Sequence, residues 1–384
     1  MPLVIEDRVS NYFVNILLII ALLISSCATD QSKNTLQSSN LYDDKDAIGI
    51  NWNLNILNFK DNFSSFVPVF DNNTIYTADS LGNIYKIDVS DGSIISHFKI
   101  NNQISSGIAA FNDAIFVTTT DGMLLSIGKI THQILWQAVL PNISIEPPLI
   151  VSNKIIVRSN GATITAYDIY SGNLLWVYDY INPPLTIRAT ATMTVPYPND
   201  ILIVGFPLGV LAVININNGM LIWQNNIATT TGATDLEKLI DITIKPVIDD
   251  KNICVTSFNG NLSCINSMTN EVIWSKPFSS THQIIINQDI LYAINQDNVI
   301  YAFNKQTGII LWHNDEIKIK IYDPFVLYNR LLVIDNNGVI YIFNNNGEIT
   351  RKINSNLLGG NIGIILNNNK VILQSANGHI AKII

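Results

Sequence analysis

The side chains able to act as nucleophiles, general acids or bases, or metal ligands are few and scattered in this chain. Its three cysteines, Cys27, Cys254 and Cys264, form no Cys-x-x-Cys pair. The five histidines fall in different parts of the sequence, at His97, His132, His282, His313 and His379. No spacing suits a zinc site or a catalytic triad. Glu146 and Asp179 are isolated acids, which we expect to be solvated loop residues. The sequence therefore favours a protein that is not an enzyme and needs no metal or cofactor.

Composition points to short strands rather than long helices. Hydrophobic residues make up 48% of the 384 residues and charged residues only 14%, and Asn, Ser, Thr and Gln supply the remaining polarity. A chain of this length can bury a real core, so it has no need of a disulfide scaffold. The net charge is −8 and there is no Lys/Arg cluster, which argues against nucleic-acid binding.

The N-terminal region has the features of an export signal. Residues 12–24 form an apolar run that is too short to span a bilayer and fits a signal peptide. The run ends in Ile24-Ser25-Ser26-Cys27, which resembles the lipobox of bacterial lipoproteins, so we expect cleavage before Cys27 and lipid attachment there. Arg8 is the one basic residue ahead of the run, which leaves the true start codon open.

The residues after Cys27 read as a tether. Residue 28 is Ala rather than Asp, which, by resemblance to enterobacterial sorting, favours the outer membrane. Residues 28–46 are polar and lack apolar periodicity. We therefore expect a signal peptide at residues 1–26, a flexible tether at 27–46, and a domain lipid-anchored at the periplasmic face of the outer membrane.

A repeat of alternating strands and Gly-containing turns fills the rest of the chain. One copy, residues 160–176, reads NGATITAYDIYSGNLLW. The first turn recurs eight times, at intervals of 38 to 51 residues, at Gly82, Gly122, Gly161, Gly209, Gly260, Asn298, Gly338 and Gly378. That period is typical of propeller blades. The last copy stops at Ile384, and residues 49–53 supply its missing strand. We predict that residues 47–384 form an all-β, eight-bladed β-propeller of four-stranded antiparallel blades, closed by the N-terminal strand.

Most copies end in a tryptophan, which we expect to pack as a wedge between blades. The series comprises Trp52, Trp136, Trp176, Trp223, Trp274 and Trp312. Ser96 and Arg351 occupy the equivalent places in two copies, where we expect thinner contacts between blades.

Cys254 and Cys264 flank the Asn259-Gly260 turn. With a two-residue turn their thiols point to opposite faces of the sheet, so we predict no disulfide. A three-residue turn would shift the register by one residue and could bring the thiols together.

The full pattern of the repeat is a Gly, then an Asp or Asn, and then Gly-x-x-x-Trp. This pattern resembles that of quinoprotein-type propellers. One interpretation is a quinone-dependent (PQQ-type) dehydrogenase. However, the chain has no adjacent cysteine pair and no insertion rich in Asp, Glu and Asn. The other interpretation is a non-enzymatic lipoprotein similar to the outer-membrane protein assembly factor B (BamB) family. A propeller that binds another envelope protein is a further alternative.

Two long intervals between copies carry the resemblance to the assembly-factor family. Residues 183–190 resemble that family's Leu-x-Leu-Arg loop, and residues 227–243 resemble its second loop segment. The resemblance implies that Leu185, Ile187, Arg188 and Asp241 bind the periplasmic domains of the barrel-inserting subunit, with Asp241 orienting Arg188. Thr243 stands where the family has a second Asp. Exposed strand edges are also able to pair with unfolded outer-membrane client chains.

Overall fold

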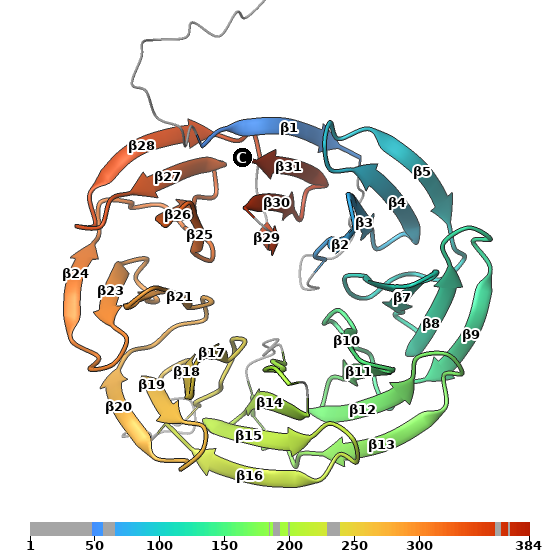
Figure 1. Ribbon diagram of the computed structural model, residues 1–384, viewed down its shortest axis with the longest axis horizontal. Helices are drawn as coiled ribbons and strands as arrows, with labels where there is room; N and C mark the ends of the chain where they lie inside the picture. Colours follow the sequence, from blue (N-terminus) through green and yellow to red (C-terminus); the bar gives the residue numbers. More distant parts are fainter. Residues whose placement is uncertain are drawn as a thin grey trace, which may run out of the picture. The chain divides into compact units, whose positions relative to one another are not determined.

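The computed structural model describes residues 48–56, 66–183, 185–186, 193–198, 200–228, 239–357, 362–367 and 369–384. The expected signal peptide and tether, including Cys27, lie outside these ranges. No helix in the described ranges is both long and apolar enough to cross a membrane. Eight antiparallel sheets surround a central axis, with one strand of each sheet at the rim (Figure 1).

In the first four blades the strands follow chain order from the centre of the ring to its rim. Blade 1 consists of β2 (Val69–Asp71), β3 (Thr74–Ala78), β4 (Asn83–Asp88) and β5 (Ile94–Lys99). Blade 2 consists of β6 (Ala109–Phe111), β7 (Ala114–Thr118), β8 (Met123–Gly128) and β9 (Ile134–Val139). Blade 3 consists of β10 (Leu149–Val151), β11 (Lys154–Arg158), β12 (Thr163–Asp168) and β13 (Leu174–Asp179). Blade 4 contains β14 (Ile201–Phe206), β15 (Val210–Asn215) and β16 (Leu221–Asn226).

The remaining blades follow the same order, except that the outer strand of blade 8 comes from the N-terminal end of the repeat region. Blade 5 consists of β17 (Val247–Asp249), β18 (Asn252–Thr256), β19 (Asn261–Asn266) and β20 (Val272–Pro277). Blade 6 consists of β21 (Ile285–Asn287), β22 (Ile290–Ile294), β23 (Ile300–Asn304) and β24 (Ile310–Asn314). Blade 7 consists of β25 (Phe325–Leu327), β26 (Arg330–Ile334), β27 (Val339–Phe343) and β28 (Ile349–Asn354). Blade 8 consists of β29 (Ile362–Asn367), β30 (Lys370–Ser375), β31 (His379–Ile383) and β1 (Ile50–Asn55).

The ring closes where the two ends of the repeat region meet. β1 pairs antiparallel with β31, so the N-terminal strand is the outer strand of blade 8 (Figure 1). The backbone N–H groups of Gly49 and Ile384 donate to each other's carbonyl oxygens, at 2.8 and 3.0 Å. The expected eight-bladed, all-β propeller is confirmed. In blade 4, Thr194 pairs with Ile203 of β14 as an isolated bridge at the inner position.

The abundance of Asn and Asp is explained by the turns. Asp79 accepts bonds from the backbone N–H groups of Leu81 and Asn83, at 3.0 Å each, between the second and third strands of blade 1. Asn304 does the same for the N–H groups of Gln306 and Thr307 between the last two strands of blade 6. Side chains of this length can bond the backbone two residues on, which closes tight turns.

The tryptophans pack as wedges between blades, as predicted. The indole N–H of Trp176 donates to the carbonyl oxygen of Ile216 in the next blade at 2.8 Å, and its ring lies against Gly219. A Cβ at Gly219 would come within 2.7 Å of that ring. Four other indoles make the equivalent bond, and they belong to Trp52, Trp136, Trp274 and Trp312. Trp223 packs against an apolar cluster drawn from blades 4 and 5.

Other groups join blades 1 and 2, where Ser96 replaces the tryptophan. Phe98 stacks on His132 of the next blade with ring centroids 4.1 Å apart. Lys129 of blade 2 forms an ion pair with Asp71 of blade 1 at 2.7 Å. The replacement therefore changes the chemistry of this junction from one large ring to a stacked pair and an ion pair. Arg351, the other replacement, is exposed to solvent.

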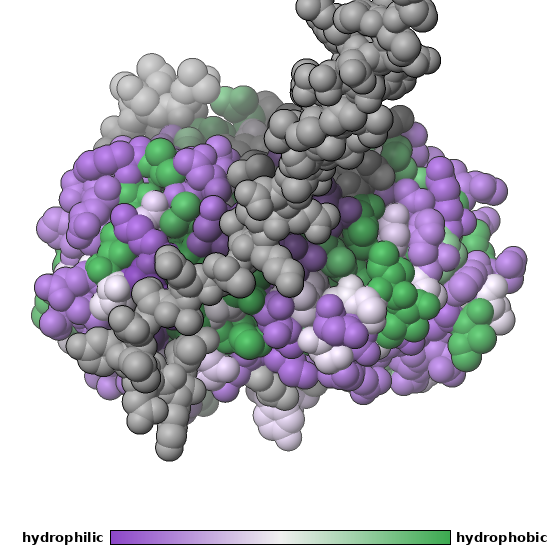
Figure 2. Space-filling view, turned by 90° about the horizontal axis from the view of Figure 1, so that it is seen from above, coloured by the Kyte–Doolittle hydropathy of each residue, from purple (hydrophilic) through white to green (hydrophobic). Residues whose placement is uncertain are grey.

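All eight outer strands have an irregular register next to the tryptophan position. Bulges of this kind interrupt the edge at which another chain could pair. Apolar side chains beside the bulges are exposed, among them Ile95, Leu135, Leu175, Ile222, Ile273 and Leu311. On the side of the ring seen in Figure 2, apolar residues form small groups between polar ones. A client strand would therefore meet only a short continuous stretch of each edge.

The prediction for Cys254 and Cys264 is wrong, because the turn between β18 and β19 has three residues. The N–H of Ser257 donates to the carbonyl oxygen of Asn261 at 3.1 Å, which leaves residues 258–260 as the loop. Asn259 has a positive φ of 51°, but Gly260 does not, so the two-residue type I′ turn is not formed. The register moves by one residue, Cys254 lies opposite Cys264 with Cα atoms 4.1 Å apart, and the two form a disulfide.

Candidate functional site

The long intervals after β13 and β16 begin on the same face of the propeller. In an antiparallel blade, the turn between the second and third strands lies on the same face as the link to the next blade. We call it the link face, and it carries the turns at Gly209 and Gly260. Ala228 and Ile240, which flank residues 229–239, both pack against these two glycines. The two ends of the second interval are therefore held together between blades 4 and 5.

Exposed apolar side chains lie beside this point. The hydroxyl of Tyr180, just after β13, donates to the carbonyl oxygen of Pro207 at 3.0 Å. Their chain neighbours, Ile181 and Leu208, are 92% and 45% exposed. Leu185 is also 45% exposed. Exposed aliphatic side chains next to a rigid scaffold are typical of protein-binding surfaces.

Near the link face lies a buried group of charges contributed by one strand and two links between blades. Arg158, the last residue of β11, donates from Nη1 to the carbonyl oxygen of Gly205 at 2.9 Å. Its guanidinium carbon lies 5.2 Å from the centroid of the Phe206 ring, a cation–π contact. Glu146 and Asp241 are the acidic groups whose charges act on Arg158, and each is no more than 5% exposed. One arginine thus offsets two buried carboxylates.

Asp241 ties blade 4 to blade 5. Its carboxylate accepts a bond from the N–H of Leu208 at 3.3 Å, and its backbone pairs with both Pro207 and Phe258. Thr243, two residues on, is 6% exposed, and its hydroxyl has no hydrogen-bond partner among the residues that the structure describes. Asp241 is therefore placed to hold the end of the second interval against the turn after β14.

Burial determines how Glu146 titrates. Desolvation raises the pKa of its carboxyl from 4.5 to about 7, and the positive charge of Arg158 acts in the opposite direction. Desolvation also lowers the pKa of Arg158, although the charges of Glu146 and Asp241 work against this. Glu146 is therefore expected to gain a proton in mildly acidic solution.

We expect the Glu146→Gln variant to change the pH dependence of stability. The folded state binds the Glu146 proton more tightly than the unfolded state does, so protonation of Glu146 stabilises the folded state. This stabilisation is fully present below the unfolded pKa of 4.5. It is lost as the pH rises through about 7. The wild type should therefore lose up to about 3 kcal/mol of unfolding free energy relative to the glutamine variant across this window. Urea denaturation at a series of pH values measures the difference.

The exposed Glu271 provides the matched control for this experiment. The Glu271→Gln variant should follow the wild type at every pH. A difference between Glu146→Gln and wild type that stays constant from pH 4.5 to about pH 8 would show that Glu146 does not titrate in this window.

A model of the family described as outer membrane protein assembly factor BamB matches residues 80–314. The chain belongs to this family. A BamB relative from Burkholderia pseudomallei is 28% identical over 279 residues, which cover 72% of each chain. Another, from Shewanella oneidensis, is 25% identical and covers 84% of this chain and 85% of its own. The crystal structure of BamB from Moraxella catarrhalis has a TM-score of 0.78 at 23% identity, covering 88% of this chain and 99% of its own.

The structure places two of the four residues expected to bind a partner. Leu185 is exposed and Asp241 is buried, whereas Ile187 and Arg188 lie outside the described residues. The arginine that lies near Asp241 in the described structure is Arg158. The expected pairing of Asp241 with Arg188 therefore remains a hypothesis.

Two residues of the buried charge group were not predicted from the sequence. Glu146 was expected to be solvated, but it is 5% exposed, because residues 144–146 of the link into β10 are buried. Arg158 occupies a strand position where other repeats have Ala78, Thr118 or Thr256. The other repeats have uncharged residues at this buried position, including Ile294, Ile334 and Gln374, so a lone arginine among them is the signal that could have identified it.

The hollow lined by the inner strands of blades 6, 7 and 8 does not suit a quinone cofactor with calcium. A quinohemoprotein alcohol dehydrogenase from Comamonas testosteroni shares the fold, with a TM-score of 0.68 at 12% identity, covering 88% of this chain and 76% of its own. In this BamB-family chain, the hollow of about 290 Å³ is lined largely by apolar side chains such as Ile284, Phe325 and Ile362, with Asp323 as its one acid. The described residues contain no group of three or more His, Cys, Asp or Glu side chains able to hold a metal. Calcium prefers six to eight oxygen ligands.

Proposed function

We propose that this chain is a non-enzymatic scaffold that assists the assembly of β-barrel proteins into the outer membrane. The observation that carries the proposal is the match of the BamB family over residues 80–314, which include both long intervals of the link face. A rigid propeller that presents loops on one face suits a binding role, since loops on rigid scaffolds commonly carry recognition.

We infer that the partner is the periplasmic part of the barrel-inserting subunit, and that it binds at the link face. Leu185, Ile187 and Arg188 would supply two apolar anchors and a planar cation, a combination typical of interface hot spots. The exposure of Leu185 supports a direct contact. The burial of Asp241 favours an indirect role, in which its carboxylate holds the end of the second interval in place.

Truncation of the anchor residues should weaken binding and leave the fold intact. For Leu185→Ala we expect a loss of about 2 kcal/mol of binding free energy, around thirtyfold in affinity, because a hot-spot side chain leaves its pocket. Arg188→Glu should cost at least as much, since it adds repulsion toward any partner carboxylate. Calorimetric titration with the purified periplasmic part of the barrel-inserting subunit measures both effects.

Met268 is the matched control, because it is 75% exposed in a turn on the opposite face. Met268→Ala should keep wild-type affinity and melting temperature. Wild-type affinity in Leu185→Ala would place the binding site elsewhere on the propeller, and a large fall in its melting temperature would indicate a packing role.

We also propose that Cys27 is acylated and holds the protein at the periplasmic face of the outer membrane. The support is the Ile24-Ser25-Ser26-Cys27 sequence after an apolar run. Cys27→Ala should move the protein from the membrane fraction to the soluble fraction, as followed by fractionation and labelling with a fatty-acid analogue. A wild-type protein that is soluble and carries no lipid would contradict the proposal.

A further inference from the structure

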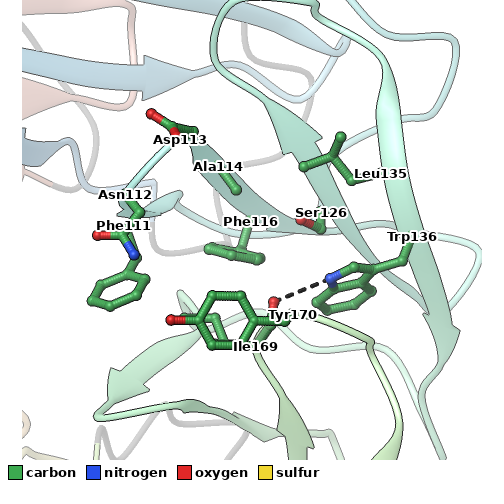
Figure 3. A pocket seen from close by; sticks show the side chains of 10 residues that line it. All are labelled: Phe111, Asn112, Asp113, Ala114, Phe116, Ser126, Leu135, Trp136, Ile169 and Tyr170. Carbon is green, nitrogen blue, oxygen red and sulfur yellow. Dashed lines mark hydrogen bonds between the residues drawn. The ribbon is translucent and has the colours of Figure 1, made fainter.

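A second candidate binding site lies between blades 2 and 3, on the face opposite the link face. It is a cavity of about 230 Å³ whose walls include the rings of Phe111, Phe116, Trp136 and Tyr170. Figure 3 shows Ile169 and Tyr170, from the turn between β12 and β13, facing the side chains of blade 2. The indole N–H of Trp136 donates to the carbonyl oxygen of Ile169 at 3.1 Å, which joins the two blades beside the cavity. This site shares no described residue with the proposed partner surface.

Two side chains beside the cavity are shorter than their equivalents one blade earlier. At the junction of blades 1 and 2, Lys86 and Lys129 each place an ammonium group 5.5 Å from the centroid of the Tyr76 ring. At the junction of blades 2 and 3, the equivalent positions hold Ser126 and Ile169. The free space is therefore of the size of a side chain, and it is smaller than the roughly 300–1,000 Å³ of a drug-sized ligand site.

The hydroxyl of Ser126 gives the cavity a polar point. Ser126 is 1% exposed and lines the cavity, and its Oγ has no hydrogen-bond partner within the described parts of the chain. A buried hydroxyl without a partner is costly, and such groups in native structures call for an explanation. A ligand that carries both a ring and a hydrogen-bonding atom would satisfy the walls and this hydroxyl together.

A cation fits this cavity less well than a neutral ring, because the junction of blades 2 and 3 has no carboxylate at the position of Asp71. Asp71 neutralises Lys129 at the junction of blades 1 and 2, and its equivalent here is Phe111. An ammonium group in the cavity would lose water without gaining a buried carboxylate. Asp113 also contributes to the lining, but it is exposed to solvent.

We propose that this cavity receives a tyrosine side chain from a partner polypeptide, with the aromatic walls holding its ring and Ser126 bonding its hydroxyl. Tyr170 is 68% exposed and Leu135 is 57% exposed, so the cavity has an apolar rim that a peptide backbone can approach. The site would give this propeller a second contact, on the face opposite the one that carries the family-like loops.

Fluorine NMR of the full chain labelled with 5-fluorotryptophan tests the proposal, and the Trp136→Phe variant assigns the Trp136 resonance. The probes are p-cresol and three blocked pentapeptides with tyrosine, phenylalanine or lysine between glycines. We expect p-cresol and the tyrosine peptide to shift this resonance with dissociation constants on the order of 1 mM. The phenylalanine peptide should bind about threefold to tenfold more weakly, since it cannot bond Ser126, and the lysine peptide should give no shift.

Variants separate the ring contact from the hydroxyl contact. Ser126→Ala should make the tyrosine and phenylalanine peptides bind equally, and Tyr170→Ala should weaken both. Ile130→Ala changes an 85% exposed residue at the matching turn of blade 2 and should behave as wild type. The proposal is overturned if no probe shifts the Trp136 resonance or if the lysine peptide binds best. It is also overturned if p-cresol binds and the tyrosine peptide does not, because the cavity would then be closed to polypeptides.

Discussion

Replacement of Arg158 by leucine is expected to lower the free energy of unfolding by about 3–5 kcal/mol. The change removes the cation that offsets Glu146 and Asp241, and it leaves the carbonyl oxygen of Gly205 without this donor. Breaking a buried ionic group by removing one member is costly, because the remaining charge stays buried without compensation. Urea denaturation of the purified variant at about pH 8 measures the loss.

Two comparisons make this result specific. At about pH 5 the loss should be smaller, because Glu146, whose pKa is raised to about 7, takes up a proton and no longer needs the arginine. The exposed Arg351 serves as the control, and Arg351→Leu should change stability by about 0.5 kcal/mol or less. Equal stability of Arg158→Leu and wild type at pH 8 would show that the buried carboxylates do not depend on Arg158.

Replacement of Trp176 by alanine is expected to cost about 3–5 kcal/mol of unfolding free energy. The side chain is 7% exposed, and it joins blade 3 to blade 4 through Ile216 and Gly219. Its removal opens a cavity at the junction, since Gly219 has no side chain with which to fill it. Trp176→Phe should cost less, because it keeps most of the packing and loses the indole bond to Ile216.

An exposed aromatic residue provides the control for Trp176. Tyr197 is 93% exposed, so Tyr197→Ala should lie within about 0.5 kcal/mol of wild type. If Trp176→Ala were as stable as Tyr197→Ala, the blades would not depend on their tryptophan wedges.

The repeat made the architecture predictable from sequence. Each blade combines alternating strands, turn residues and an outer tryptophan, and these local preferences agree with one another in copy after copy. The closure of the ring could be foreseen because the last copy lacks a strand and residues 49–53 supply one. The wedge role of Trp176 followed from the same pattern.

The disulfide was not predictable in this way, because it depends on a register shift of one residue between two strands. The two readings of the turn at Asn259-Gly260 differ by one residue, and that residue decides whether Cys254 and Cys264 face each other. Asn-Gly favours a two-residue turn in isolation. The bond from Ser257 to Asn261 selects the longer turn instead.

The buried charges and the cavity between blades 2 and 3 depend on contacts between copies of the repeat. Glu146 lies in a link and Arg158 at the end of a strand, and sequence spacing gives no sign that they share a buried space. Beside the cavity, Ser126 and Ile169 stand where the junction one blade earlier has two lysines. Comparing equivalent positions from blade to blade is the way to find such sites in a repeat protein.

The binding of the wild-type chain to the barrel-inserting subunit tests the account most directly. We would immobilise the full chain and titrate the purified periplasmic part of that subunit, together with Leu185→Ala and Met268→Ala as the sensitive and insensitive variants. We predict saturable binding by the wild type and by Met268→Ala, and about thirtyfold weaker binding by Leu185→Ala. Folded wild-type protein that shows no binding, or that binds a different envelope protein instead, would contradict the proposed role in outer-membrane assembly.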